Sequence, residues 1–208
     1  EKGWPRDRAM YLPNHATPEI ATPVSRASLD TPEDAPLLFS LGRMHPVKGF
    51  DVLLTALQRV PNAYLWLAGE GPARAELEAL GTRLGVASRV RFLGWREDKA
   101  ALFAAADIAI FPSRYEPFGT VTLEAWAYET PLVAAASAGP ASIITDERDA
   151  LLVPIDDASA MAHALNRLVG DPALRDALVA GGKATFDGNF TKAAVVRRYL
   201  DFFERIKT

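Results

Sequence analysis

Two acidic side chains flank a glycine in the middle of the chain, just after an apolar run. The stretch Ser113–Tyr128 reads SRYEPFGTVTLEAWAY, with seven residues between Glu116 and Glu124 and with Gly119 among them. Carboxylates accept hydrogen bonds from hydroxyl groups, and the free amides at a helix start attract anions. The stretch therefore has the chemistry to bind a ligand that carries hydroxyl groups and phosphate.

Each residue of this stretch has a specific possible role. The amides of Phe118, Gly119 and Thr120 would lie at a helix start, and a glycine permits close approach because it lacks Cβ. Glu124, one turn into the helix, is suited to accept two vicinal hydroxyls such as those of a ribose. The alternative is that Glu124 is an ordinary surface charge and Glu116 a carboxylate favoured by the helix dipole. Both interpretations remain open on these residues alone.

A second loop carries two cations between a predicted strand and a predicted helix. It begins with Gly42 and Arg43 and ends with Lys48 and Gly49. Arginine presents a planar fork to phosphate oxygens, lysine a point charge, and a helix start adds its positive end. A solvated loop with two unrelated cations is the alternative. The later GEGP sequence at 69–72 predicts only a tight backbone turn, since no Walker A or GxGxxG pattern accompanies it.

These loops lie within an alternation of short apolar runs, which predict strands, and segments with helical periodicity. The expected strands are 37–41, 63–68, 89–93, 107–111, 131–136 and 150–154. Helices are expected at 50–60, around 77–84, at 97–106, at 120–129, around 161–168, and from Asp171-Pro172 onward with Gly181-Gly182 near the end. Six strands alternating with helices predict an α/β fold with a Rossmann-like, doubly wound parallel sheet. In such a sheet, ligands bind at the carboxyl ends of the strands.

The chain divides into three segments by composition. Residues 1–36 are rich in proline and predict a lead-in or interdomain linker, with Tyr11–Asn14 forming at most one short strand. Residues 37–190 hold the strand–helix alternation and form the expected Rossmann-like domain. Residues 191–208 predict an amphipathic helix, which must pack on this domain or on another one.

Composition excludes several classes of function. The 208-residue chain carries a net charge of −3, which gives no electrostatic case for nucleic acid as a partner. It has no cysteine, which excludes disulfides and thiolate metal sites and agrees with a reducing compartment. Its three histidines are isolated, so no metal site is expected. No apolar run approaches the roughly 20 residues of a membrane span, and no signal peptide is expected before the fold. The chain begins with Glu1 rather than Met, which agrees with a fragment.

Taken together, the motifs resemble those of a known family. LGRMHPVKG, LAGEGP, VRFLG, PSRYEPFGTVTLEA and ALLVP occur in the order found in retaining glycosyltransferases of family 4, which have the GT-B architecture. The resemblance covers about residues 37–169 and is carried above all by the joint occurrence of the E-x7-E element and the Arg–Lys loop. It identifies the chain as the carboxyl-terminal, donor-binding domain of such an enzyme.

The resemblance implies a site for a nucleoside-diphosphate sugar without a metal or other cofactor. Arg43 and Lys48, with the adjacent Gly42, would hold the diphosphate and stabilise its charge as the glycosidic bond breaks. Glu116 would contact hydroxyls of the transferred hexose, so that Arg43, Lys48 and Glu116 are the expected catalytic residues. Glu124 would bind the ribose hydroxyls.

The remaining donor contacts implied by the resemblance come from the backbone. Amides from Phe118 through Gly119 and Thr120 to Val121 would cradle sugar and phosphate. The base would lie against the backbone around Arg91 and Phe92.

The partner implied by the resemblance is the amino-terminal, acceptor-binding domain of the same enzyme, without which no transfer is expected. The acceptor would be a glycan, lipopolysaccharide or glycolipid. The enzyme is expected in the cytoplasm, with peripheral association at the inner membrane face through the missing domain. The alternatives are a non-catalytic nucleotide-sugar binding module and a GT-B relative such as a sugar-nucleotide epimerase.

Three positions depart from the family pattern. Glu129 and Ala150 stand where many members have glycine, and SAGPASII has one glycine and no glutamate where a GGxxE pattern is common, with Ser142 near the glutamate position. None of these positions removes an expected donor contact.

Overall fold

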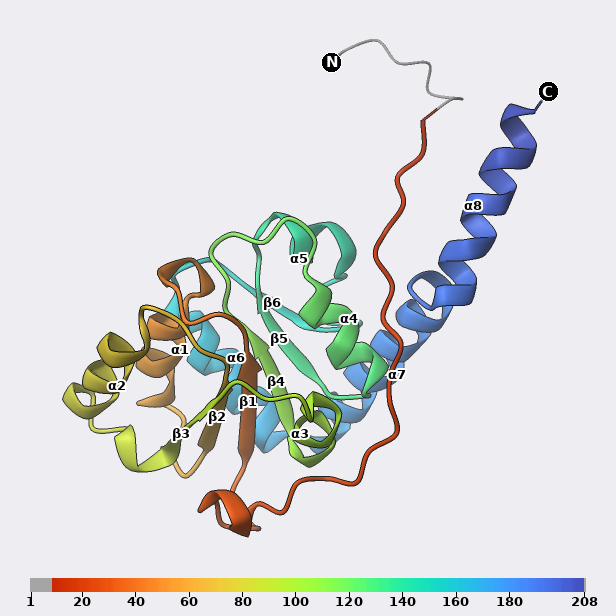
Figure 1. Ribbon diagram of the computed structural model, residues 1–208. Coiled ribbons are helices and arrows are strands. Elements are labelled where there is room, and N and C mark those ends of the chain that lie inside the picture. The colour runs from red at the N-terminus through yellow and green to blue at the C-terminus, as the bar shows by residue number, and fades with distance from the viewer. Residues whose placement is uncertain (1–8, 208) are drawn as a thin grey trace.

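The computed structural model describes residues 9–207 as an α/β fold with one parallel sheet between two layers of helices (Figure 1). The strands are β1 (Leu37–Leu41), β2 (Tyr64–Ala68), β3 (Val90–Gly94), β4 (Ile108–Phe111), β5 (Leu132–Ala135) and β6 (Leu151–Val153). All neighbours in the order β3-β2-β1-β4-β5-β6 pair in parallel. The predicted fold class and all six predicted strands are confirmed.

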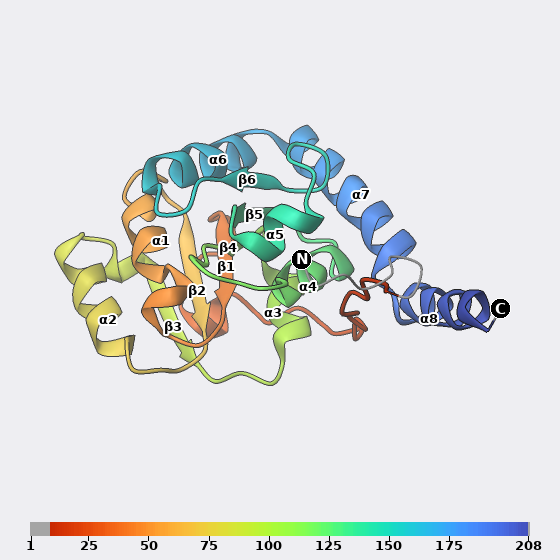
Figure 2. The same cartoon turned by 90° about the horizontal axis from the view of Figure 1, so that it is seen from above.

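Helices cover both faces of this sheet, as Figure 2 shows from above. They are α1 (Phe50–Leu57), α2 (Arg74–Arg83), α3 (Lys99–Ala105), α4 (Thr120–Ala127), α5 (Ala138–Ile143), α6 (Ala158–Gly170), α7 (Pro172–Asn189) and α8 (Lys192–Ile206). Leu38 packs in one apolar cluster with α1, α2 and α6, whereas Leu37 and Phe39 pack in the other with α3 and α4. Because both faces are buried, the strands are continuous apolar runs rather than alternating ones.

The strand order places a topological switch point between β1 and β4. The chain moves from β1 outward through β2 to β3, then returns to place β4 on the other side of β1. Loops after two such strands diverge to opposite faces and leave a crevice at the carboxyl edge. The loop after β1 carries Arg43 and Lys48, and the loop after β4 carries Glu116, so the fold brings both predicted loops to this crevice.

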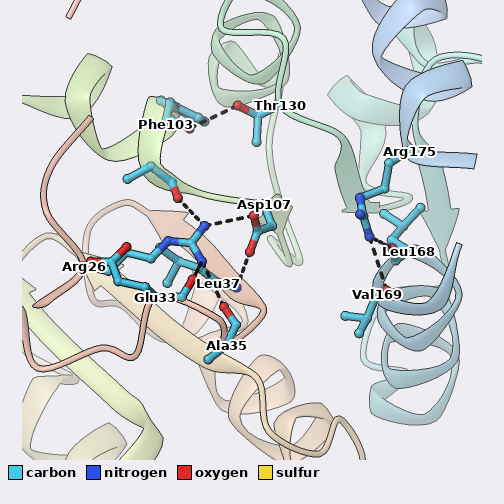
Figure 3. Close-up of polar contacts among 11 residues, drawn as sticks. Arg26, Glu33, Ala35, Leu37, Phe103, Asp107, Thr130, Leu168, Val169 and Arg175 are labelled. Atoms are coloured by element: carbon cyan, nitrogen blue, oxygen red, sulfur yellow. Dashed lines mark hydrogen bonds and ion pairs between the residues drawn. The ribbon is translucent and has the colours of Figure 1, made fainter. Parts of the chain in front are cut away.

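The lead-in is fastened to the sheet rather than hanging free. Arg26 forms an ion pair with Asp107 at 2.9 Å and donates to the carbonyls of Ala35 at 3.0 Å and Ala105 at 2.8 Å (Figure 3). Asp107 in turn accepts a hydrogen bond from the Leu37 amide at 2.7 Å, at the amino end of β1.

The first eight residues of the predicted 1–36 segment, and Thr208 at the other end, lie outside the described residues. The short strand allowed at Tyr11–Asn14 does not form.

Two helices differ from the sequence-based expectation. Helix α5 forms within SAGPASII, where no helix was predicted. Helix α7 continues through Gly181 and Gly182, which were expected near its end. The reason is close packing: a Cβ on Gly181 would lie 1.9 Å from the Arg148 carbonyl oxygen, and one on Gly182 would lie 2.3 Å from Trp126 Cδ1. These glycines therefore permit contact between α7 and its neighbours, although glycine weakens a helix.

Helix α8 extends away from the body of the molecule (Figures 1 and 2). It runs over Lys192–Ile206, within the segment for which an amphipathic helix was expected. Val195 is its one buried residue among those described, whereas Tyr199, Leu200 and Phe203 are 41–57% exposed. Its apolar face is therefore largely uncovered.

Candidate functional site

A cavity of about 690 Å³ opens at the carboxyl edge of the sheet. Loops that follow three neighbouring strands line it, together with residues from α3 and α4. The lining residues that bear chemistry are Gly42, Arg43, Gly69, Glu70, Trp95, Arg96, Glu97, Lys99 and Glu124. A cavity of this size matches those that bind nucleotide-sized ligands.

Backbone packing between loops shapes one wall of this cavity. A Cβ on Gly69 would lie 2.0 Å from the Gly42 carbonyl oxygen, and one on Gly71 would lie 2.4 Å from the Met44 carbonyl oxygen. The Met44 amide donates to the Glu70 carbonyl at 2.9 Å. The glycines of GEGP therefore do more than turn the chain, because they let the loops after β1 and β2 pack backbone to backbone.

Arg43 is a cation without a protein partner in this cavity. Within residues 9–207 its guanidinium forms no hydrogen bond or ion pair, and the side chain is exposed. Most other arginines of the described chain are occupied by carboxylates or carbonyls. An unpaired guanidinium at a cavity wall is available to an anionic ligand.

The loop after β1 and the loop after β4 meet in a lysine–glutamate pair. Lys48 Nζ lies 2.9 Å from Glu116 Oε2, and these side chains are only 22% and 19% exposed. Lys48 also lies 5.6 Å from the centre of the Phe111 ring, a cation–π contact. Gly49, at φ +67°, makes this possible, since a Cβ there would lie 2.1 Å from the Pro112 carbonyl oxygen. The structure thus joins two residues predicted separately.

Arg114 locks the same two loops together. Its guanidinium contacts Asp51 at 2.8 and 2.6 Å and Asp156 at 2.6 Å, and also donates to the Pro46 carbonyl. Its amide donates to the Val47 carbonyl at 2.9 Å. Burial acts to raise the pKa of Asp51, but the Arg114 guanidinium outweighs it and lowers that pKa. The hydrogen bonds that Arg114 donates to Asp51 in turn raise the pKa of Arg114.

Arg114 was not predicted as a site residue from the sequence. It lies two positions before Glu116, inside the conspicuous stretch, and its charge was the available signal. Its partners Asp51 and Asp156 are distant in sequence, so no spacing rule connects them.

Glu124 has a partner, Lys99, that was not predicted from the sequence either. Lys99 Nζ lies 2.5 Å from Glu124 Oε1, with side-chain exposures of 46% and 12%. The hydrogen bond to Glu124 raises the pKa of Lys99. Glu124 is therefore not the exposed surface charge of the alternative interpretation, since it is almost buried and lines the cavity.

The start of α4 offers backbone amides. Gly119 caps α4 with φ +92°, a left-handed conformation that favours glycine. The amides of Phe118 and Gly119 donate no hydrogen bond within residues 9–207. Gly139 supports this turn, because its amide donates to the Glu116 carbonyl at 2.8 Å and a Cβ there would lie 2.4 Å from the Phe118 carbonyl carbon.

Of the predicted donor residues within 9–207, Gly42, Arg43 and Glu124 line the cavity of about 690 Å³. Those outside its lining are Lys48, Arg91, Phe92, Glu116, Phe118, Gly119, Thr120 and Val121. Thr120 borders two smaller neighbouring cavities, and Val121 packs partly against the apolar core. Arg91 donates to the Leu29 carbonyl at 3.1 Å and lies 5.3 Å from the Tyr64 ring, so its side chain anchors the lead-in. Phe92 packs against the core. Beyond β3 the cavity is bordered instead by residues 95–97.

Neither a metal site nor a membrane span is found in the described part of the chain. No group of three metal-ligating side chains gathers anywhere in residues 9–207. Within the same residues, every helix is too short or too polar to cross a bilayer.

Solved structures similar to this one include a sucrose-phosphate synthase and a protein solved with UDP and glucose. Sucrose-phosphate synthase from Thermosynechococcus elongatus superposes with a TM-score of 0.82 at 32% identity, over 94% of this chain and 52% of that one. HepE from Anabaena, solved with UDP and glucose, superposes with a TM-score of 0.79 at 26% identity, over 86% of this chain and 50% of that one. The fold is thus that of the carboxyl-terminal half of GT-B glycosyltransferases.

Sequence comparison identifies the family. The profile described as "Glycosyl transferases group 1" matches residues 22–185, and the chain belongs to this family. A lipopolysaccharide core biosynthesis glycosyltransferase, LpsD of Rhizobium meliloti, is 42% identical over 99% of this chain and 60% of its own length. The chain therefore spans about 60% of that relative. The resemblance inferred from the motifs is confirmed.

Proposed function

We propose that this chain is the donor-binding half of a retaining glycosyltransferase that takes a hexose from a nucleoside-diphosphate sugar. The observation that carries the proposal is the cavity at the carboxyl edge of the sheet, lined by the loops after β1, β2 and β3 and by Glu124 of α4. It places an unpaired Arg43 and a nearly buried Glu124 on its walls, and its lining loops include the one that ends in the Lys48–Glu116 pair. The structure of HepE with UDP and glucose supports the same ligand class here.

The diphosphate of the donor would lie beside the two cations, Arg43 and Lys48. Arg43 would bind its oxygens through the guanidinium fork, and Lys48 would contribute a compact charge beside it. As the glycosidic bond breaks, negative charge develops on the leaving phosphate, and these preplaced cations stabilise it. The free amides of Phe118 and Gly119 would add donors, with Thr120 and Val121 behind them at the start of α4.

The hydroxyl groups of the donor would bind the two carboxylates, Glu124 and Glu116. Glu124 would accept the ribose hydroxyls, and Glu116 would accept hydroxyls of the transferred sugar. The base would lie near the carboxyl end of β3. Because the Arg91 side chain is turned to the lead-in, we assign the base to the loop beyond Phe92, where the 76%-exposed Trp95 borders the cavity.

The whole enzyme would supply the rest of the site. The acceptor-binding domain is the expected partner, so this chain alone should bind donor without transferring sugar. LpsD is named for lipopolysaccharide core biosynthesis, and a lipopolysaccharide core saccharide is the acceptor we propose, handled in the cytoplasm at the inner membrane face.

Calorimetry on the 208-residue chain tests the donor site. UDP, GDP and ADP are titrated in turn, and at least one should bind in the micromolar to millimolar range. Arg43→Ala should weaken that binding about tenfold while leaving the affinity for the free nucleoside unchanged, because a charge-assisted hydrogen bond to phosphate is lost. No binding of any of the three at millimolar concentration would refute the proposal.

A donor screen on the protein at its natural length tests the reaction. Incubation with UDP-, GDP- and ADP-hexoses should release one nucleoside diphosphate in an acceptor-dependent way. Binding without acceptor-dependent release from any donor would favour a non-catalytic binding module instead.

A further inference from the structure

Lys99 stands at an unfavourable position for helix stability. It is the first residue of α3, where a cation opposes the positive end of the helix dipole. The preceding Asp98 does not cap the helix with its side chain, because that carboxylate is paired with Arg96 at 2.5 and 2.7 Å. A residue that violates a local rule is expected where another requirement outweighs helix stability.

That requirement is the carboxylate of Glu124. Glu124 lies on α4 and is only 9% exposed. An ionised carboxylate at such a position needs a charged or hydrogen-bonding partner. Within residues 9–207, Lys99 is the one ion-pair partner of Glu124.

The pair also forms part of the ligand space. Lys99 and Glu124 line both the cavity of about 690 Å³ and a neighbouring cavity of about 220 Å³. The lead-in residues 15–18 border the smaller cavity, so the pair lies where the two spaces adjoin. Lys99 contacts only one carboxylate oxygen, Oε1, and leaves Oε2 without a hydrogen bond among the described residues.

We infer that Lys99 is a positioning residue for ribose recognition, which aims the carboxylate of Glu124 at the vicinal hydroxyls of a ribonucleoside diphosphate. This rests on the proposed function of the cavity. The free Oε2 and the second lone pair of Oε1 remain to accept the two hydroxyls. Without Lys99, the carboxylate would lose the contact that orients it and turn toward solvent, which removes an acceptor from the ribose.

The test compares ribose with 2′-deoxyribose. Calorimetry on the 208-residue chain uses whichever of UDP, GDP and ADP binds most tightly, together with its 2′-deoxy form. The parent should prefer the ribose form by about tenfold, the value of one hydrogen bond to a charged acceptor. Lys99→Met should reduce this preference to less than about twofold, and Lys99→Arg should restore most of it because it keeps the charge.

Two controls distinguish a positioning role of Lys99 from a general contribution of its charge and from a folding defect. Lys183→Met removes a lysine that is likewise paired with a glutamate, Glu129 at 3.4 Å, but lies on α7, and it should leave the preference unchanged. Inorganic pyrophosphate, which has no ribose, should bind Lys99→Met as tightly as the parent. This second measurement also shows that the variant is folded.

Several outcomes would overturn the inference. A Lys99→Met chain that keeps the parental preference would do so, as would an equal loss of affinity for pyrophosphate and both nucleotides, since Lys99 would then contribute only charge. If Lys99→Met does not fold, a Lys99→Arg chain that has lost the preference would overturn it too. If the parent binds no nucleoside diphosphate at all, the proposed function fails, and this inference fails with it.

Discussion

Two lysine–glutamate pairs lie at the same edge of the sheet, but the protein holds them differently. Lys48 and Glu116 are both about four-fifths buried, and their loops are fixed by backbone packing at Gly49 and by the bonds of Arg114. In the other pair only Glu124 is buried, and Lys99 remains about half exposed on a seven-residue helix. The Lys48–Glu116 pair is therefore held rigidly, whereas the Lys99–Glu124 pair is adjustable.

This difference agrees with the chemistry proposed for each pair. Charge that develops during bond breaking is stabilised best by groups that do not have to move. Recognition of ribose hydroxyls requires only that the Glu124 carboxylate be correctly aimed, which its partner Lys99 can achieve. The two pairs should therefore respond differently to substitution.

The largest effect is expected at the rigid pair. Lys48→Met should lower turnover of the natural-length protein by about 10²–10³-fold, because a preplaced cation is lost at the leaving phosphate. Release of nucleoside diphosphate measures it, with Lys183→Met as the control. Retention of more than a third of the parental turnover would contradict the role of Lys48.

The two glutamates should differ in what they impair. Glu124→Ala should weaken nucleoside diphosphate binding by the 208-residue chain about tenfold or more, because the ribose loses a charged acceptor. Glu116→Ala should change that binding less than about threefold and should mainly slow sugar transfer. Calorimetry on both variants checks this, and equal affinities for the two would remove the distinction between the pairs.

Substitution of Arg114 tests whether the Lys48–Glu116 pair is held rigidly. Arg114→Met should lower the free energy of unfolding by about 1–3 kcal/mol, because Asp51 and Asp156 lose hydrogen bonds to a charged partner. Urea denaturation measures it. Arg83→Met is the matched control, since Arg83 is exposed and forms no ion pair within residues 9–207. If both variants unfold at the same urea concentration, Arg114 does not fasten these loops.

The smallest effect should appear as a pH dependence. Arg114 holds the pKa of Asp51 below its ordinary value of 3.8. Asp51 therefore contributes its full stabilisation above about pH 4 and loses it as the pH falls through the lowered pKa. Asp51→Asn should make the urea midpoint less sensitive to acid between about pH 4 and pH 2. A variant with the parental acid sensitivity would show that the pair is too solvent-screened to matter.

Much of the fold followed from short-range patterns. The six strands were predictable because both faces of the sheet are buried, so each strand is a bounded apolar run. Helix α5 was missed because glycine and proline in SAGPASII suggested a loop, and the extent of α7 was missed because Gly181 and Gly182 suggested an end. In α7 the glycines serve contacts with Arg148 and Trp126, which no local rule reveals.

The departures from the family pattern are partly explained by backbone conformation. Glu129 adopts φ +54°, the left-handed region in which glycine is favoured. The glycine that many family members have at this position would adopt the conformation without strain. Glu129 is less favourable there, and it forms an ion pair with Lys183. The structure offers no comparable explanation for Ala150.

The sequence by itself determined the residue types of the site, the loops that carry them and the fold that brings those loops to one edge. These follow from local spacing: glycines at turns, cations and carboxylates after apolar runs. Only the tertiary structure decided the partners, joining Lys48 to Glu116, Lys99 to Glu124 and Arg114 to Asp51. It also turned Arg91 away from the cavity. Such pairings depend on how distant loops pack in three dimensions, because an ion pair between residues tens of positions apart leaves no periodic trace in the chain.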